Sequence, residues 1–152
     1  MRSDKFFTLL DPLFSLKHVF FGNFDSSSLG HGLNRTQERV LMIVWHHEDP
    51  PMRFLSREAG LEKGSLTTVV DSLEALGLVL RERDEDDRRS FIVKTTPAGS
   101  RLAERVNALF RDHLDNLFGQ LTREERLEFE RSARSLALLI PQFSAFAPSS
   151  GC

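Results

Sequence analysis

Apolar and polar residues near the N-terminus follow the spacing of a helix, which predicts a helix over residues 3–21. Its apolar residues cover a wide arc, so this helix needs cover on more than one side. Asp11 followed by Pro12 is typical of a helix N-cap and first helical residue. We therefore expect a kink or break there, with the main helix over 12–21. Residues 22–32 are rich in Gly and Ser and are expected to form a loop.

Three further helices are predicted in the next part of the chain. Asn34 and Gln37 have the spacing of a capping box, so a helix begins at Asn34, and the segment "HEDPP" ends it. A short helix over 54–60 and another over 62–77 each end at a glycine, a common C-terminal stop. Five apolar residues of the last helix share one face: Leu66, Val69, Val70, Leu73 and Leu76.

The period then changes from that of a helix to that of a strand. The segments "LVLRER" and "SFIVKTT" are short and rich in β-branched and aromatic residues. The stretch "RERDEDDRRS", residues 81–90, overlaps the end of the first segment and the start of the second. It contains nine charged residues and one serine. This pattern predicts a β-hairpin with a long charged tip.

Two longer helices are predicted after the hairpin. Thr96 and Pro97 have the character of an N-cap and first helical residue, and Gly119 ends the helix that they begin. The last helix is predicted over 123–140, with a T-x-x-E capping box at its start and Pro141 at its end. In all, two short helices precede a two-stranded ribbon, which is the winged helix-turn-helix arrangement. In that arrangement the second helix of the pair enters the DNA major groove, and the hairpin tip lies beside it.

The composition of the 152 residues, 40% hydrophobic and 28% charged, is that of an ordinary globular domain. No apolar run approaches the roughly 20 residues that span a bilayer, and the N-terminus lacks the features of a signal peptide. The one cysteine, Cys152, is the last residue, so no internal disulfide or thiolate metal site is expected. These features favour a cytoplasmic protein that is not associated with a membrane.

Two features of the composition bear on partners. The net charge of −2 argues against a protein that coats nucleic acid indiscriminately, yet it allows a local basic contact surface. The chain has 13 Phe and no Tyr, and the phenylalanines concentrate near both ends. We therefore expect the two ends to build a shared apolar layer.

The chain resembles the MarR-type transcriptional regulators over roughly residues 33–100. The resemblance rests on "LNRTQERVL", on "LSREAGLEKGSLTTVVDSLEALGLVLRERDEDDRRSFIV" and on "TPAG", and its most specific part is "GLVLRERDEDDRR". It implies a mainly α fold with a small β-hairpin wing in a single domain, 1–152. A winged helix-turn-helix lobe, 33–96, would bind DNA, and helices within 3–24 and 97–146 would interlock in an obligate homodimer.

The resemblance also implies which residues contact DNA. The recognition helix, 62–77, would enter the major groove of a palindromic operator through five residues: Lys63, Ser65, Thr67, Thr68 and Ser72. Short hydroxyls can donate to phosphates or contact base edges. Family members often carry arginine at the position of Thr68 and a basic residue at that of Ser72. This chain should therefore depend more on its wing, or be tuned to a different base sequence.

In the wing, 84–90, the family's D-x-R element falls on Asp87 and Arg89. A narrow minor groove concentrates negative potential and attracts an inserted guanidinium. Asp87 would hold the loop by pairing with Arg89 or with backbone N–H groups, which spares the arginine an ordering cost. Arg88 is the second candidate cation, and the acids at 84–86 would keep the tip soluble and extended.

Other functions have weaker support in the sequence. No nucleophile, phosphate-loop or chelating motif appears, so we expect neither an enzyme nor a cofactor. A zinc site built from His46 or His47 with His113 is an open alternative to solvated or capping histidines. The resemblance implies a regulator, a repressor in the family's usual mode, that a small aromatic or anionic ligand releases from DNA. A winged-helix protein-interaction module without a DNA operator is the other alternative.

Overall fold

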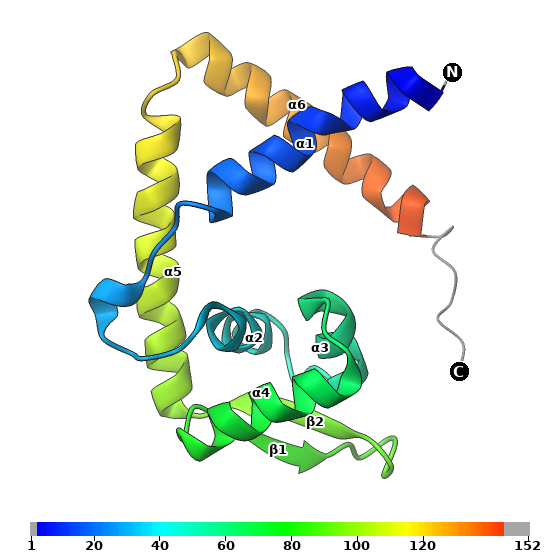
Figure 1. Ribbon diagram of the computed structural model, residues 1–152, viewed down its shortest axis with the longest axis vertical. Coiled ribbons are helices and arrows are strands. Elements are labelled where there is room, and N and C mark those ends of the chain that lie inside the picture. The colour runs from blue at the N-terminus through cyan, green and yellow to red at the C-terminus, as the bar shows by residue number, and fades with distance from the viewer. Residues whose placement is uncertain (1–2, 145–152) are drawn as a thin grey trace. The chain divides into compact units, whose positions relative to one another are not determined.

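The computed structural model describes the backbone of residues 3–144, together with the side chains of residue 8 and of residues 10–142. In chain order the helices and strands are α1 (Ser3–Phe21), the 3-10 helix η1 (Ser27–Leu29), α2 (Arg35–His46), α3 (Met52–Ala59), α4 (Lys63–Ala75), β1 (Val79–Arg83), β2 (Phe91–Thr95), α5 (Pro97–Phe118) and α6 (Arg123–Ser144) (Figure 1). The predicted fold class, mainly α with one β-hairpin, is confirmed. The chain forms two compact units, Met1–Phe110 and Arg111–Cys152.

Helix starts follow from the capping residues. The Asn34 side chain accepts from the Gln37 N–H at 2.9 Å, and the Gln37 side chain accepts from the Asn34 N–H at 2.9 Å. Thr122 and Glu125 form the same reciprocal pair at the start of α6, at 3.2 and 2.8 Å. Each pair satisfies N–H groups that have no partner within the helix, and both predicted capping boxes are confirmed.

The predicted break at Pro12 and the predicted end of the last helix at Pro141 were wrong. α1 continues without a break through Pro12, and α6 runs through Pro141 to Ser144. A proline inside a helix removes one N–H donor and crowds the carbonyl four residues earlier. Each helix nevertheless continues beyond its proline, α1 to Phe21 and α6 to Ser144.

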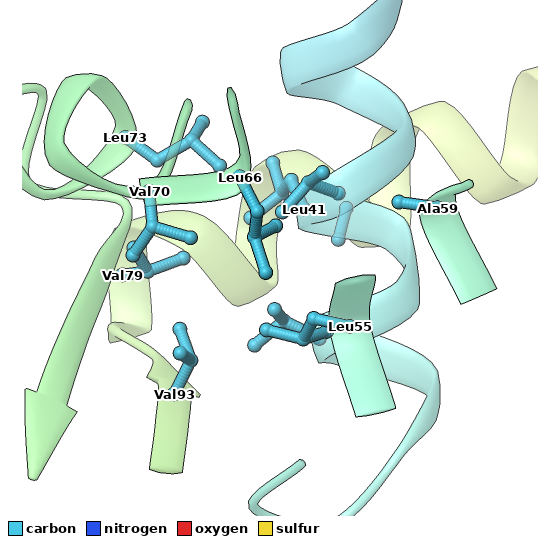
Figure 2. Close-up of a cluster of buried hydrophobic side chains, with 11 residues drawn as sticks. Leu41, Leu55, Ala59, Leu66, Val70, Leu73, Val79 and Val93 are labelled. Atoms are coloured by element: carbon cyan, nitrogen blue, oxygen red, sulfur yellow. The ribbon is translucent and has the colours of Figure 1, made fainter. Parts of the chain in front are cut away.

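The core of the winged-helix lobe lies between α2, α3, α4, the hairpin and the start of α5. Figure 2 shows side chains from these elements converging on one apolar cluster. Its buried members are Val40, Leu41, Val44, Leu55, Ala59, Leu66, Val70, Leu73, Val79, Val93 and Ala103. Burial of each larger aliphatic side chain contributes about 1.5–3 kcal/mol before losses of entropy. The core thereby fixes which face of α4 points inward and which remains free.

The hairpin is antiparallel and is tied to the α2–α3 linker. The register pairs Val79 with Thr95 and Arg83 with Phe91. The linker adds a bridge between Pro51 and Ile92, and its Pro50 carbonyl accepts from the Val93 N–H at 3.1 Å. The hairpin is therefore held along β2 as well as by its own ladder.

The start of α5 closes the base of the hairpin. The Thr96 N–H donates to the Leu78 carbonyl at 3.0 Å, and the Thr96 hydroxyl donates to the Gly77 carbonyl at 2.6 Å. The same hydroxyl accepts from the Gly99 N–H at 3.0 Å, which caps α5. A Cβ at Gly99 would lie 1.9 Å from the Leu78 oxygen. Glycine at this position of the T-x-x-G motif is therefore required for α5 to approach the hairpin.

A buried polar cluster organises the linker between α1 and α2. Ser26 is 6% exposed, and its hydroxyl lies 3.0 Å from His31 Nε2 and donates to the Glu38 carboxylate. His31 Nε2 is 3.1 Å from Glu38 Oε2, while His31 Nδ1 accepts from the Leu33 N–H at 3.0 Å. Because Nδ1 accepts, a neutral His31 ring carries its proton on Nε2, facing the carboxylate. The cluster satisfies its buried polar groups internally.

Aromatic rings pack where the sequence concentrates phenylalanine. The Phe110 ring of α5 stacks on Phe21 at 5.3 Å and meets Phe24 edge-on at 5.0 Å. The predicted apolar layer between N-terminal and C-terminal phenylalanines is confirmed for these three rings. In the second unit, Phe118 and Phe129 pack at 5.0 Å.

Candidate nucleic-acid interface

The outer face of α4 is polar because Leu66, Val70 and Leu73 hold the opposite face in the core. Lys63, Ser65 and Thr68 are exposed there, and Thr67 is half-buried. The Thr67 hydroxyl donates to the Lys63 carbonyl at 2.9 Å, and the Thr68 hydroxyl donates to the Gly64 carbonyl at 3.2 Å. The hydroxyl oxygens can still accept from a ligand, and the rotors can turn outward. Four of the five predicted contact residues thus lie on or beside an accessible polar surface.

Ser72 differs from the other four because its hydroxyl accepts from Gln37 Nε2 at 2.7 Å. Gln37 also completes the cap of α2, so one amide joins the start of α2 to the third turn of α4. Ser72 therefore has a structural partner, whether or not it also contacts DNA. The sequence does not reveal this pairing, since 35 positions separate the two residues.

Arg81 of β1 contacts both acids of α4. Its Nε and one terminal nitrogen donate to Glu74 Oε2 at 3.2 and 2.8 Å, and its backbone N–H donates to Glu74 Oε1 at 3.1 Å. The same terminal nitrogen pairs with the Asp71 carboxylate. The hydrogen bonds that Arg81 donates lower the pKa of Glu74, and donating to Glu74 and Asp71 raises the pKa of Arg81. Sequence reasoning missed this arrangement, although two acids three residues apart, followed by a strand arginine, are its signal.

The wing tip is held by its own backbone and by Asp87. The Asp87 carboxylate accepts from the Arg89 N–H at 3.1 Å, and the Asp87 carbonyl accepts from the Ser90 N–H at 2.8 Å. We expected Asp87 to hold the loop either by pairing with Arg89 or by accepting from backbone N–H groups. The bond from the Arg89 N–H is of the second kind. Arg88 and Arg89 are both exposed, as a reach into a groove requires.

Asp84 and Arg83 order the tip further, which the sequence interpretation missed. The Asp84 carboxylate accepts from the Asp86 N–H at 2.9 Å and from the Asp87 N–H at 3.4 Å. The Arg83 guanidinium donates to the Arg88 carbonyl at 2.7 Å and lies over the Phe91 ring, 5.3 Å from its centroid. Asp84 therefore folds the tip, a role beyond the one that the sequence suggested for it. An aspartate two residues before the bonded N–H is the Asx-turn pattern, which was the available signal.

The other face of the hairpin carries a separate ion-pair group. Lys94 Nζ lies 2.7 Å from Glu82 Oε2 and 3.4 Å from Asp49 Oδ2. The hydrogen bond to Glu82 raises the pKa of Lys94. Asp49 belongs to the α2–α3 linker and has a positive φ of 47°. These charges fix the hairpin against the linker, away from α4.

The two histidines at the end of α2 have aromatic neighbours. The His46 ring packs on Trp45 at 4.9 Å, and the His47 ring meets Phe54 edge-on at 4.7 Å. Across the residues whose placement is described, no group of three or more His, Cys, Asp or Glu is arranged to hold a metal ion. Within the same residues, no helix has the length and apolarity to cross a membrane.

Comparisons with known proteins match this architecture. Residues 33–91 match the model of the MarR family. The HTH-type transcriptional regulator MhqR of Bacillus subtilis is 36% identical over 98 residues, which cover 62% of this chain and 66% of MhqR. The chain therefore spans slightly less than two thirds of that relative.

Two solved structures share the fold. A MarR family protein from Bacillus stearothermophilus superposes with a TM-score of 0.75 at 23% identity, over 93% of this chain and 99% of that one. NadR, solved in complex with 4-hydroxyphenylacetate, superposes with a TM-score of 0.67 at 23% identity, over 83% and 89%. At this level of identity the structural likeness establishes the fold alone.

Proposed function

The chain belongs to the MarR family, and from this premise we propose that it is a sequence-specific regulator of transcription that binds double-stranded DNA. The observation that carries the proposal is the pairing of α4 with the wing. One compact unit contains both α4 and the hairpin (Figure 1). The outer face of α4 is polar, and the hairpin tip carries the exposed Arg88 and Arg89. A helix for the major groove beside a hairpin tip for the flanking groove is the winged-helix mode of docking.

In this proposal the face of α4 contacts base edges and phosphates in the major groove. The contacting residues are Lys63, Ser65, Thr67, Thr68 and Ser72. Lys63 is the one cation of α4, so phosphate attraction from this helix is weak. The hydroxyls can donate to phosphate oxygens or to base acceptors, which gives selectivity through geometry more than through charge.

The wing supplies the second contact, at the minor groove. Arg89 inserts, with Arg88 beside it, while Asp87 holds the backbone that presents them. A guanidinium gains most in a narrow minor groove, where the negative potential is strongest. Because the acids of the tip repel phosphates, binding should rest on these few placed arginines and show little indiscriminate attraction.

We further propose that the regulator acts as a homodimer on a palindromic operator. α1 and α6 expose large apolar side chains, among them Phe14 at 69% and Leu138 at 78%. Exposed apolar residues concentrated on two helices favour burial against a second copy. A two-fold dimer reads two half-sites about one helical turn apart.

Release from DNA by a small aromatic or anionic ligand is part of the same proposal. The structural neighbour NadR was solved with 4-hydroxyphenylacetate, a molecule that is both aromatic and anionic. Thermal shift of the purified chain against phenolic acids tests this step; no shift with any of them would favour a constitutive DNA binder. We assign the protein to the cytoplasm, as a repressor without catalytic activity.

Selection from random duplex DNA tests the whole proposal. A palindromic consensus with half-sites about one helical turn apart is the expected result. If no sequence is enriched even at low salt, DNA binding is wrong. The net charge of −2 and the acids of α4 would then favour a protein-interaction module.

A further inference from the structure

The recognition helix of this chain carries acidic side chains that would repel DNA phosphates. α4 has one cation, Lys63, and two acids, Asp71 and Glu74. Asp71 lies one turn beyond Thr67 and Thr68 on the same side of the helix, and 55% of its side chain is exposed. A carboxylate so placed lies well within the Debye length, about 8 Å at physiological salt, of any phosphate that α4 approaches. Left bare, it would oppose the binding that the neighbouring hydroxyls support.

Arg81 is placed to neutralise these acidic side chains. It lies on β1 two residues after the core residue Val79, on the same side of the strand, and its side chain is only 23% exposed. Its guanidinium bonds Glu74 through two nitrogens and Asp71 through one of these, so a single cation serves both carboxylates. Charge-assisted bonds of this kind are directional, and they fix the position of both partners.

The same contacts join the two elements that contact DNA in the proposed function. Both Glu74 oxygens are occupied by Arg81, one by its backbone N–H and the other by its side chain. The first strand of the wing is thereby fixed to the third turn of α4. Lys94 does not serve this purpose, because it pairs with Glu82 and Asp49 on the linker side of the hairpin.

Resting on the proposed function, we propose that Arg81 is a positioning residue for DNA binding that neutralises the recognition-helix acids Asp71 and Glu74. Arg81 does not itself contact DNA in this role. Its charge offsets the acids of α4 at the side of the helix that carries the polar contact residues.

The test is fluorescence anisotropy of the full chain on its selected operator and on a scrambled duplex at several salt concentrations. Arg81→Met should weaken operator binding by at least about tenfold at low salt, with less effect as salt rises, because two bare acids then face phosphates. The triple variant Arg81→Met/Asp71→Asn/Glu74→Gln should regain most of that affinity. Lys94→Met is the matched control, since it removes a paired hairpin cation but leaves the acids of α4 neutralised; its affinity should fall less than threefold.

Each outcome decides a different point. If the triple variant binds as weakly as Arg81→Met, neutralisation is wrong and Arg81 serves the fold alone. If Arg81→Met binds like the wild type, the inference is wrong while the proposed function stands. If the wild type binds no duplex, both fail together.

A second variant covers the case in which Arg81→Met does not fold, as circular dichroism would show. Asp71→Asn/Glu74→Gln keeps Arg81 and removes the acids, so its affinity should equal or exceed that of the wild type. A loss of affinity in this variant would instead overturn neutralisation as the role of Arg81.

Discussion

The side chains of Gln37 and Ser72 meet at 2.7 Å, with the amide nitrogen donating to the hydroxyl. Gln37 caps α2 through its oxygen and reaches α4 through its nitrogen, so both ends of its amide are used. α4 is therefore held in place by a residue that belongs to the cap of another helix. A hydroxyl on the proposed DNA face thus also stabilises the free protein.

Ser72→Ala should lower the free energy of unfolding by about 1 kcal/mol, because the half-buried amide of Gln37 loses its acceptor. Urea unfolding followed by circular dichroism measures this. Thr68→Ala is the control, since the Thr68 hydroxyl bonds only to a carbonyl of its own helix at 3.2 Å and alanine favours a helix. Equal losses in the two variants would contradict the structural role of Ser72.

Arg89→Ala should weaken operator binding and reduce the salt slope of log K by about one, while the chain stays folded. The guanidinium is exposed and its backbone is braced by Asp87, so the loss lies in the complex. Binding titrations between low and moderate salt measure both quantities. Glu85→Gln, in the same tip, should bind as well as the wild type or better. Unchanged affinity of Arg89→Ala would show that the wing assignment is wrong.

Asp84→Ala separates the structure of the tip from its charge. Removal of an acid near DNA should strengthen binding by electrostatics alone. Asp84 accepts from two backbone N–H groups, so its loss should loosen the tip and weaken operator binding by roughly three- to tenfold. Asp86→Ala removes the same charge and should give no loss. Hydrogen exchange at residues 86 and 87 should be faster in Asp84→Ala only, and tighter binding by both variants would argue against an ordered tip.

Gly99→Ala should destabilise the chain by about 1–3 kcal/mol, because the new methyl would overlap the Leu78 carbonyl. Gly64→Ala is the matched control, since a Cβ at Gly64 meets nothing within 4 Å. That variant should be more stable than the wild type by about 0.5–1 kcal/mol. Thermal melts of the two variants should move in opposite directions. If both melt at higher temperature, the close approach of α5 to Leu78 is absent in solution.

Leu136→Glu/Ile140→Glu places two charges on one face of α6, where both side chains are exposed in the single chain. If that face is buried against a second copy, the variant should be a monomer, or nearly so, by light scattering with size-exclusion chromatography. Arg134→Glu puts the same side chain on another face of α6 and should remain dimeric. A wild-type chain that elutes as a monomer at micromolar concentration would rule out the homodimer.

How much of the structure can be predicted from the sequence depends on how far apart in the sequence the interacting residues lie. Both capping boxes, the hairpin and the core face of α4 follow from residues within a few positions of one another, and the structure contains all of them. The unbroken course of α1 through Pro12 and the end of α6 did not follow, because a proline removes one N–H donor from a helix without always ending it. The pair Gln37–Ser72 could not be predicted, since 35 positions separate the two residues and only the folded chain brings their helices together. The pair Arg81–Asp71 was missed, although two acids three residues apart, followed by a strand arginine, were its signal.

The hydrogen bonds of the wing tip begin and end within residues 83–90. A loop whose hydrogen bonds are all internal can be replaced as a unit, because its replacement requires few changes in the strands that flank it. Transplanting these eight residues between relatives should transfer minor-groove preference without refolding the host lobe. In the proposed mode of binding, operator choice can therefore diverge through a short segment, while the helix and the core beneath it stay as they are.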